Sequence, residues 1–162
     1  MLEDDANAAL PKVRAAEPGD LDRLVEFNLA MAQETEGRDL DLATLREGMR
    51  ALLGDPGRGR VLVVEDAGRI VATLMLTTEW SDWRNGWFWW IQNVYVAPEE
   101  RRRGHYRRLH EHVRDLAAAR TDVYGLRLYV ENENVRARET YQKLGMDETP
   151  YRLYEQATRR GG

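Results

Sequence analysis

The spacing of apolar residues in the first third of the chain predicts a short strand and then two helices. Residues 12–15 form the predicted strand, and Asp20 follows a turn at the position of a helix N-cap. The first helix should end by Gly37 and the second at the glycine-containing residues 54–57. Their apolar faces consist of Leu21, Leu24, Val25 and Leu29 in the first helix and Leu42, Leu45, Met49 and Leu52 in the second.

The middle of the chain has the pattern of β-strands. Residues 60–66 and residues 69–79 flank Ala67-Gly68, which predicts a hairpin with a tight turn. A polar turn over residues 81–86 leads into residues 87–96, which are apolar on both faces and therefore predict a central strand.

Helices and strands alternate in the last third. A long helix is predicted after Gly104, a strand over residues 126–130, and a shorter helix from Asn134 to a stop at Gly145. Residues 146–156 should be extended, as two short strands around a proline. The apolar stripes are Tyr106, Leu109, Val113 and Leu116 in the long helix and Ala137, Tyr141 and Leu144 in the shorter one.

This order of elements and the length predict one α/β domain. The strands at residues 87–96 and 126–130 should be parallel neighbours, joined through the long helix by a right-handed crossover. A chain of 162 residues, 43% hydrophobic and 32% charged, has the balance of a globular protein with a core of its own.

The composition narrows the chemistry. The chain has no cysteine, which excludes a disulfide scaffold, a thiolate metal site and a cysteine nucleophile. Its formal charge of -4 argues against general binding to nucleic acid. The acidic start lacks the pattern of a signal peptide, and no apolar run approaches the roughly 20 residues of a membrane helix. We therefore expect a cytoplasmic protein with no membrane partner.

The junction after the predicted central strand has the most distinctive sequence. Residues 101–104, Arg-Arg-Arg-Gly, lead directly into the long helix. The first N–H groups of a helix have no internal partner and lie at its positive end, so a pyrophosphate can bind there. The glycine allows close approach to the backbone, and arginines add charge-assisted bonds. Taken alone, such a loop is more typical of a solvated basic turn.

Two motifs together resemble those of the GNAT superfamily of N-acetyltransferases. The acetyl-CoA signature of that family, Arg/Gln-x-x-Gly-x-Gly/Ala after a central strand, aligns with Arg101, Gly104 and Tyr106. Downstream, residues 134–146, with Tyr141 and a Leu-Gly pair, resemble the family's asparagine–tyrosine–Leu-Gly element. Tyr106 departs from the signature, and its N–H can serve a phosphate only if the phenol turns away.

The resemblance implies a single GNAT-like α/β domain with a mixed central sheet of about six or seven strands flanked by about four helices. The domain would span residues 12–157, between a flexible lead-in at residues 1–11 and a C-terminal tail at residues 158–162. Acetyl-CoA would be the co-substrate, and the acceptor would be an amine on a small molecule or a protein. A homodimer is compatible with the resemblance.

The resemblance also implies the roles of individual residues. The backbone of Val94 and Val96 would pair with the pantetheine arm as an added strand, and Asn134 would hydrogen-bond near it. Tyr141 would be catalytic and protonate the departing thiolate. The expected cofactor-binding residues are Val94, Tyr95, Val96, Arg101, Arg102, Arg103, Gly104, His105, Tyr106, Arg107 and Asn134, and no metal ligands are expected.

Several of these residues also have purely structural interpretations. Tyr141 shares a helical face with apolar residues and can be part of the core, while Asn134 can be a helix N-cap. The three histidines, His105, His110 and His112, lack metal-ligand spacing and are expected at the surface. The general base stays open among Glu34, Glu79, Asp82 and Glu131. Core and turn packing is expected for most of the tryptophans, and one or two could instead line a pocket for an alkylammonium through cation–π contact. They are Trp80, Trp83, Trp87, Trp89 and Trp90.

Two other functions compete with acetyl transfer. A non-catalytic acyl-CoA-binding regulatory domain would keep the fold and the cofactor loop without turnover. A nucleic-acid patch formed by the arginines of residues 101–108 is disfavoured by the acidic charge of the whole chain.

Overall fold

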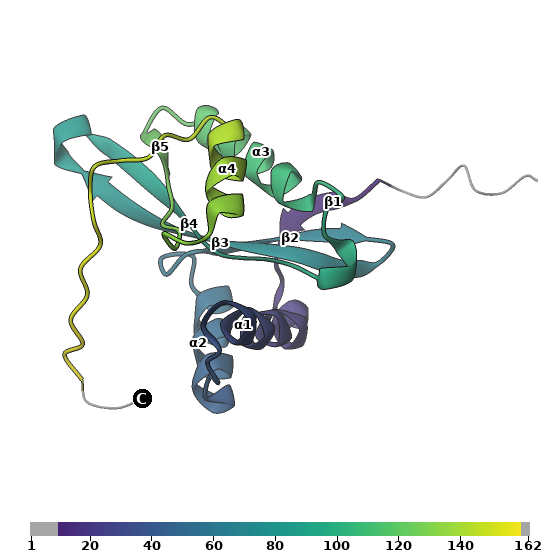
Figure 1. Cartoon of the computed structure of the whole chain (residues 1–162). Helices are drawn as coiled ribbons and strands as arrows, with labels where there is room; N and C mark the ends of the chain where they lie inside the picture. Colours follow the sequence, from purple (N-terminus) through teal and green to yellow (C-terminus); the bar gives the residue numbers. More distant parts are fainter. Residues whose placement is uncertain (1–9, 160–162) are drawn as a thin grey trace, which may run out of the picture. The chain divides into compact units, whose positions relative to one another are not determined.

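The computed structural model describes residues 10–159 (Figure 1). They divide into two units, residues 10–128 and residues 129–159, each described here by itself. Most of the predicted lead-in and the end of the predicted tail lie outside the described residues. The prediction of one domain over residues 12–157 stays a prediction. In the first unit the strands are β1 (Lys12–Ala15), β2 (Arg60–Asp66), β3 (Arg69–Ser81), β4 (Gly86–Val96) and β5 (Val123–Arg127), and the helices are α1 (Leu21–Glu36), α2 (Leu42–Gly54) and α3 (His105–Ala118).

The five strands form one mixed sheet in the order β1-β2-β3-β4-β5. The first three pairings are antiparallel, and β4 pairs with β5 in parallel, as predicted for strands linked through a helix. The α/β fold with a mixed sheet is therefore confirmed. The described residues contain fewer strands than the six or seven expected, because the extended segment after residue 145 forms none.

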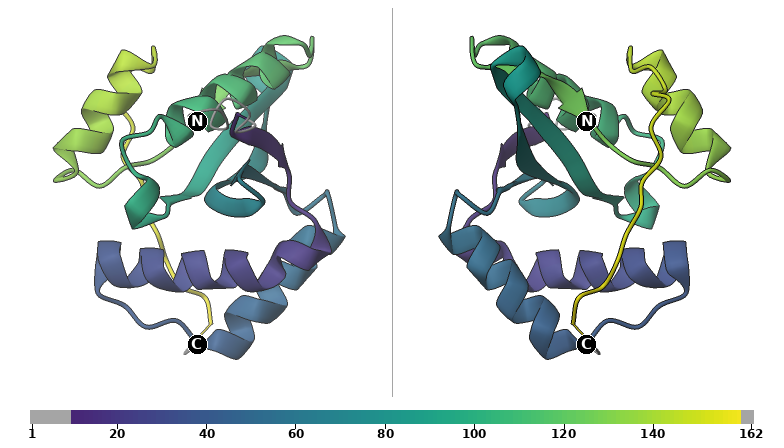
Figure 2. Two further views of the ribbon diagram at one scale, coloured as in Figure 1. Left: turned by 90° about the vertical axis from the view of Figure 1, so that its right-hand side faces the viewer. Right: turned by 90° about the vertical axis from the view of Figure 1, so that its left-hand side faces the viewer.

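Helices cover both faces of this sheet. Figures 1 and 2 show α1 and α2 together on one face and α3 on the other. The alternation of side chains along β2 explains both layers, since Leu62 and Val64 join the core under α3, whereas Val61 and Val63 join the core under α1 and α2. All four valines and leucines are at most 6% exposed, so this strand is buried on both sides.

The buried stripe of α3 differs from the predicted one. Leu109 and Val113 are fully buried as expected, but Leu116 is 38% exposed and its neighbour Ala117 is buried instead. The stripe therefore follows a four-residue spacing that begins at His105. The prediction was wrong because it chose the larger apolar residue over the alanine that continues the inward face.

The second correction concerns β5, which starts three residues before the predicted strand at residues 126–130. Gly125 is inside this strand and does not precede it. A Cβ there would lie 3.3 Å from the ring of Phe88 on β4, so the glycine makes room for an aromatic ring. The predicted strand had started only after this glycine.

A β-bulge interrupts β4. Thr73 of β3 pairs with Tyr95 and Met75 pairs with Gln92, so the residue between them on β3 faces two residues of β4. Asn93, in this bulge, has a positive φ of 50°. The extra residue reverses the alternation of side chains beyond it, which places Val94 with the core under α3 and Tyr95 with the core under α1.

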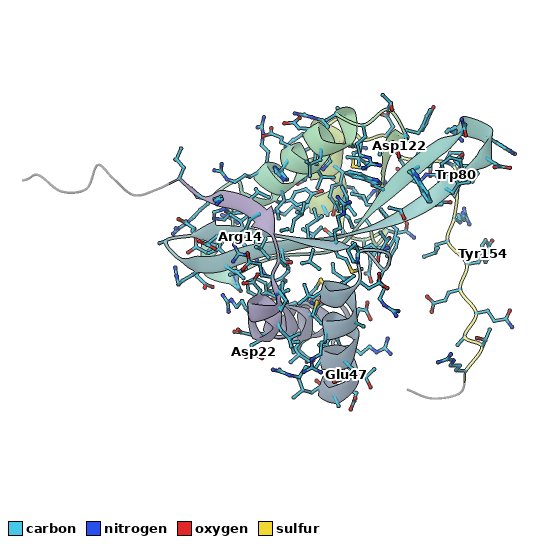
Figure 3. The ribbon with its side chains drawn as sticks, turned by 180° about the vertical axis from the view of Figure 1, so that it is seen from behind. Arg14, Asp22, Glu47, Trp80, Asp122 and Tyr154 are labelled. Carbon is cyan, nitrogen blue, oxygen red and sulfur yellow. The ribbon has the colours of Figure 1, made fainter. Side chains whose placement is uncertain are left out.

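Arg14 connects β1 to the start of α1 (Figure 3). Its guanidinium donates to Asp20 at 2.8 Å and to Glu65 of β2 at 2.7 Å. Asp20 occupies the N-cap position of α1, but its carboxylate accepts from the Glu17 N–H and from Arg14 and does not cap the helix, which corrects the prediction. The hydrogen bond from Arg14 lowers the pKa of Asp20 and keeps it ionised.

The tryptophans divide between the core and an exposed hairpin end. Trp89 is buried and Trp87 packs against the core, as expected. Trp80, labelled in Figure 3, is 48% exposed and contacts the ring of Trp87 edge-on, while Trp83 in the turn is 87% exposed. Packing was predicted for most of the five tryptophans, and Trp83 is an exception to it.

The second unit contains α4 (Val135–Lys143) and an extended segment. The side chain of Asn134 accepts the N–H of Ala137 at 3.1 Å and caps the helix. At its other end, Gly145 has a φ of 89°, and the Met146 N–H donates to the carbonyl of Tyr141, which is the Schellman pattern. The Leu-Gly pair of the motif is thus a helix stop.

The extended segment of this unit carries exposed aromatic and aliphatic side chains. Tyr151 is 77% exposed, Leu153 70% and Tyr154 90% (Tyr154 is labelled in Figure 3). Apolar residues at positions 151, 153 and 154 do not alternate strictly, so the segment lacks the one-sided pattern of a half-buried strand.

No helix within residues 10–159 is long and apolar enough to cross a membrane.

Candidate functional site

The site begins at an unpaired edge of β4. Parallel pairing with β5 runs from Trp87 to Trp90 and ends there. Beyond it, the backbone of residues 91–96 pairs with β3 on one side, and no described strand pairs with it on the other. Val94 and Val96 lie on this edge and are half-buried. Backbone groups on such an edge can bond an extended ligand, although the Val96 carbonyl already accepts from Arg101. The pairing of these two residues with a pantetheine arm stays a prediction.

A tight loop links this edge to α3. Arg102 and Gly104 both have positive φ, 66° and 79°, and Gly104 is the N-cap residue of the helix. The first intrahelical bond runs from the Arg108 N–H to the Gly104 carbonyl at 3.0 Å. The N–H groups of residues 105–107 precede it and have no carbonyl partner within the helix. The loop therefore presents the helix end that an anion requires.

Three arginines of this region, Arg101, Arg103 and Arg107, are engaged with carboxylates. Arg101 bonds Glu34 at 2.7 Å and the Val96 carbonyl at 3.0 Å. Arg103 lies 3.1 Å from Glu100, and Arg107 bonds Glu111 at 2.8 Å. These side chains were expected to add positive charge to a phosphate site. Since these three charges are already paired, an anion at the loop would meet mainly the backbone N–H groups and the exposed Arg102.

The side chain of Tyr95 points away from α3, and its backbone pairs with Thr73 of β3. Its predicted role in cofactor binding stays a prediction. The ring is 6% exposed and packs at 5.1 Å from Phe27. Its hydroxyl donates to Glu34 at 2.9 Å, the same carboxylate that pairs with Arg101. This network ties α1 to β4 and to the first residue of the loop. Sequence patterns did not reveal it, because its members are far apart in the chain.

Two of the candidate general bases are poor proton acceptors. The hydrogen bond from Arg101 lowers the pKa of Glu34, and the hydrogen bond from the Trp90 indole lowers the pKa of Glu79. Arg127 also bonds Glu79, at 2.9 Å. Asp82 and Glu131 are exposed, and Glu131 belongs to the second unit.

The histidines correct a prediction. All three were expected at the surface, yet His105 is 3% exposed and His110 is 2% exposed, and His112 is half-buried. His105 is the first residue of α3, and its Nε2 atom lies 3.6 Å from Glu100 Oε2. The four-residue spacing of the stripe on α3 places His105 on its inward face, and that spacing was the signal in the sequence.

Tyr106, the residue that departs from the signature, packs along α3. Its hydroxyl lies 3.3 Å from His110 Nδ1 and the two rings meet edge-on at 5.9 Å. The ring also packs against the core under α3. The phenol therefore turns along the helix toward His110. The binding of a ligand by the backbone of Tyr106 stays a prediction.

The remaining predicted residues, Asn134 and Tyr141, belong to the second unit. Asn134 uses its side-chain oxygen in the helix cap, so its NH₂ group would be the one to contact a cofactor. Tyr141 is half-buried, and burial raises the pKa of its phenol. The phenol thus carries its proton throughout the neutral pH range, as a general acid must.

The comparisons with known proteins identify the family. The sequence profile described as "Acetyltransferase (GNAT) family" matches residues 23–146, which span both motifs. The chain is a GNAT acetyltransferase family member. This confirms the resemblance drawn from the two motifs, and it supports acetyl-CoA as the co-substrate that the family uses.

Solved structures agree with this membership. A possible acetyltransferase from Clostridium difficile 630 is 42% identical, with a TM-score of 0.87 over 93% of this chain and 99% of that one. A predicted acetyltransferase with acetyl-CoA from Clostridium acetobutylicum is 19% identical, with a TM-score of 0.73 over 91% and 96%. Glucosamine-6-phosphate N-acetyltransferase from Arabidopsis thaliana is 21% identical, with a TM-score of 0.69 over 90% and 97%. The last two show the fold alone. No curated protein matched the chain.

The packing of Tyr106 gives a first prediction for this GNAT protein. Tyr106→Ala should lower the free energy of unfolding by about 2 kcal/mol, because a half-buried ring and its contact with His110 are lost. The affinity for CoA should change little, since the backbone N–H remains. Urea unfolding and calorimetric titration measure the two effects. A large loss of CoA affinity at unchanged stability would show that the phenol itself contacts the cofactor.

The burial of His110 gives a second prediction. Burial, and then the charge of Arg114, lower the pKa of His110, with Glu111 opposing them. In the unfolded chain His110 takes up a proton at a higher pH than in the folded chain. The free energy of unfolding therefore falls as the pH drops from about 6.5 toward the pKa of His110 in the folded chain. Replacing His110 with phenylalanine should flatten this part of the stability–pH curve. An equally steep fall in the variant would contradict the assignment.

Proposed function

We propose that this chain transfers an acetyl group from acetyl-CoA to an amine by direct attack of the amine on the thioester. The observation that supports it best is the unpaired edge of β4 leading into the Gly104 loop and the start of α3. An extended pantetheine arm and a pyrophosphate need these two features next to each other.

The cofactor would bind mainly through backbone groups. The pantetheine amides would pair with Val94 and Val96, as an added strand does. The pyrophosphate would accept N–H groups of residues 105–107, at the positive end of a helix of 14 residues. Arg102, exposed in the loop, would supply charge to the same phosphates. Asn134 would contact the pantetheine through its amide.

The acetyl transfer itself requires an oxyanion donor and an acid. As the amine attacks, negative charge builds on the carbonyl oxygen, and a backbone N–H of β4 at the bulge would stabilise it. Tyr141 would protonate the sulfur as CoA leaves. Proton transfer from a phenol of ordinary pKa ~10 to a thiolate of pKa ~8.5 is uphill by about 2 kcal/mol, and the burial of Tyr141 adds to this cost. A slow chemical step can accommodate it.

The amine must lose a proton before it attacks. For an alkylamine of pKa near ~10.4, this costs about 5 kcal/mol at pH 7. The lowered pKa values of Glu34 and Glu79 make them weak acceptors of that proton. We therefore assign no side chain as general base, and a water molecule would carry the proton to solvent.

Direct attack can be tested separately from the overall reaction. The chain has no cysteine, so the usual acetyl-thioester intermediate on the enzyme cannot form. Incubation with acetyl-CoA alone should give no acetylated protein by intact-mass spectrometry, and initial rates should show sequential kinetics. A stoichiometric acetyl-enzyme and ping-pong kinetics would contradict the direct mechanism.

A further inference from the structure

Three ligating side chains meet beside the Gly104 loop, outside the groups used above for acetyl transfer. Asp66 ends β2, Glu100 lies in the short 3-10 helix before the loop, and His105 begins α3. One ligand atom from each lies within 4.8 Å of the others. All three residues belong to the first unit.

Burial makes this cluster unusual. The side chain of His105 is 2% exposed and that of Glu100 is 7% exposed. Both ring nitrogens of His105 and the Oε2 atom of Glu100 are buried without a hydrogen-bond partner. Buried polar atoms in proteins are nearly always bonded, so the unbonded imidazole of His105 indicates a missing ligand beside it. Glu100 Oε2 has an ion pair with the exposed Arg103, at 3.1 Å, and no hydrogen bond of good geometry. His105 Nε2 and Glu100 Oε2, 3.6 Å apart, both border the place where the missing ligand would sit.

We propose that Asp66, Glu100 and His105 bind a zinc ion. Zinc takes imidazole nitrogen and carboxylate oxygen at about 2.0–2.2 Å in a tetrahedral arrangement, in which two ligand atoms lie about 3.4 Å apart. The 3.6 Å between His105 and Glu100 already fits that spacing. An imidazole with two carboxylates favours zinc over magnesium, which prefers oxygen ligands and several waters. Water would fill the fourth position.

The neighbouring arginines can give way to the ion. Arg69 lies 3.5 Å from Glu100 Oε1, and Arg103 lies 3.1 Å from Oε2. Both side chains are more than half exposed, so they can move into solvent at little cost. Arg69 can keep its contact with Oε1 while zinc takes Oε2. The carboxylate of Glu100 therefore pairs with a positive charge both without the ion, when Arg103 is its partner, and with it, when zinc is.

The ion would fasten the loop at both ends. Glu100 and His105 flank residues 101–104, where two residues have positive φ, and Asp66 belongs to the hairpin of β2 and β3. Zinc would hold this loop against the sheet. The proposal goes beyond acetyl transfer and does not depend on it, since its geometry involves no acetyl-CoA.

Calorimetric titration of the tag-free, chelator-stripped full chain with zinc chloride tests the proposal. We expect one zinc per chain, and at least about a 100-fold weaker affinity for Asp66→Asn, which keeps the shape of the side chain. His105→Leu should have the same effect, and it replaces an unpartnered buried polar group with an apolar one of similar size. His112→Ala, which removes an imidazole of α3 outside the cluster, should bind zinc as the wild type does.

Thermal unfolding provides the second readout. Zinc should raise the melting temperature of the wild type and of His112→Ala, and should leave that of a folded Asp66→Asn variant unchanged. Absence of stoichiometric zinc binding would overturn the proposal. So would equal zinc affinity in the wild type and in Asp66→Asn or His105→Leu, whichever is folded by circular dichroism.

Discussion

Replacing Tyr141 with phenylalanine should slow acetyl transfer by about 10²- to 10⁴-fold. The ring remains, so the packing of α4 and the affinity for acetyl-CoA should persist. The hydroxyl matters only as the thiolate forms, and the loss should therefore appear in kcat more than in KM for acetyl-CoA. Steady-state rates with single-turnover measurements would separate the chemical step from product release.

The matched control is Tyr154→Phe, which removes a hydroxyl from the same unit on a side chain that is 90% exposed. Its turnover should equal that of the wild type. If Tyr141→Phe, folded and limited by chemistry, also turned over at the wild-type rate, Tyr141 would be a packing residue and the acid would be water or another group.

Placing a negative charge at residue 104 should greatly weaken CoA binding. Gly104→Glu brings a carboxylate to the N-cap of α3, where the pyrophosphate is proposed to bind. Two like charges about 4 Å apart repel by about 1 kcal/mol in water and about 4 kcal/mol near a protein surface, which corresponds to a loss of about 5- to 10³-fold in affinity. Calorimetric titration with CoA measures it.

Two further variants separate charge from backbone strain at this position. Residue 104 has a φ of 79°, so any Cβ is disfavoured there by about 1–2 kcal/mol, although an added Cβ would meet no atom within 4 Å. Gly104→Ala carries only this strain, and Gly104→Gln adds the side chain without the charge. CoA affinity should fall most in Gly104→Glu. Equal affinities in the Glu and Gln variants would show that no phosphate lies near residue 104.

The sequence predicted those features of the fold that local patterns determine. The two antiparallel strands around Ala67-Gly68, the helix that ends before Gly37 and the helix after Gly104 all depend on turn residues and apolar spacing within a few positions. The parallel neighbour of β4 followed from chain connectivity. The Asn134 cap is equally local, since its partner is three residues away.

Features that depend on distant residues were not predictable in this way. The bulge at Asn93 is a matter of register between two strands, and it decides which face of the sheet Tyr95 occupies. The burial of Glu100 beside His105 is equally hidden, because a charged residue in a basic loop has the pattern of a surface residue. Asp66 gave no signal at all, since it joins this cluster only through the hairpin of β2 and β3.

Acetyl transfer to an amine is tested most directly by measuring the release of CoA thiol from acetyl-CoA, with and without amines. The panel would contain a diamine, an aminoglycoside-type antibiotic, free amino acids and peptides with a lysine or a free N-terminus. We expect thiol release that depends on at least one amine, and an acetylated amine product heavier by one acetyl group. Tight CoA binding with no amine-dependent release across the panel would contradict it and would favour a non-catalytic acyl-CoA-binding domain.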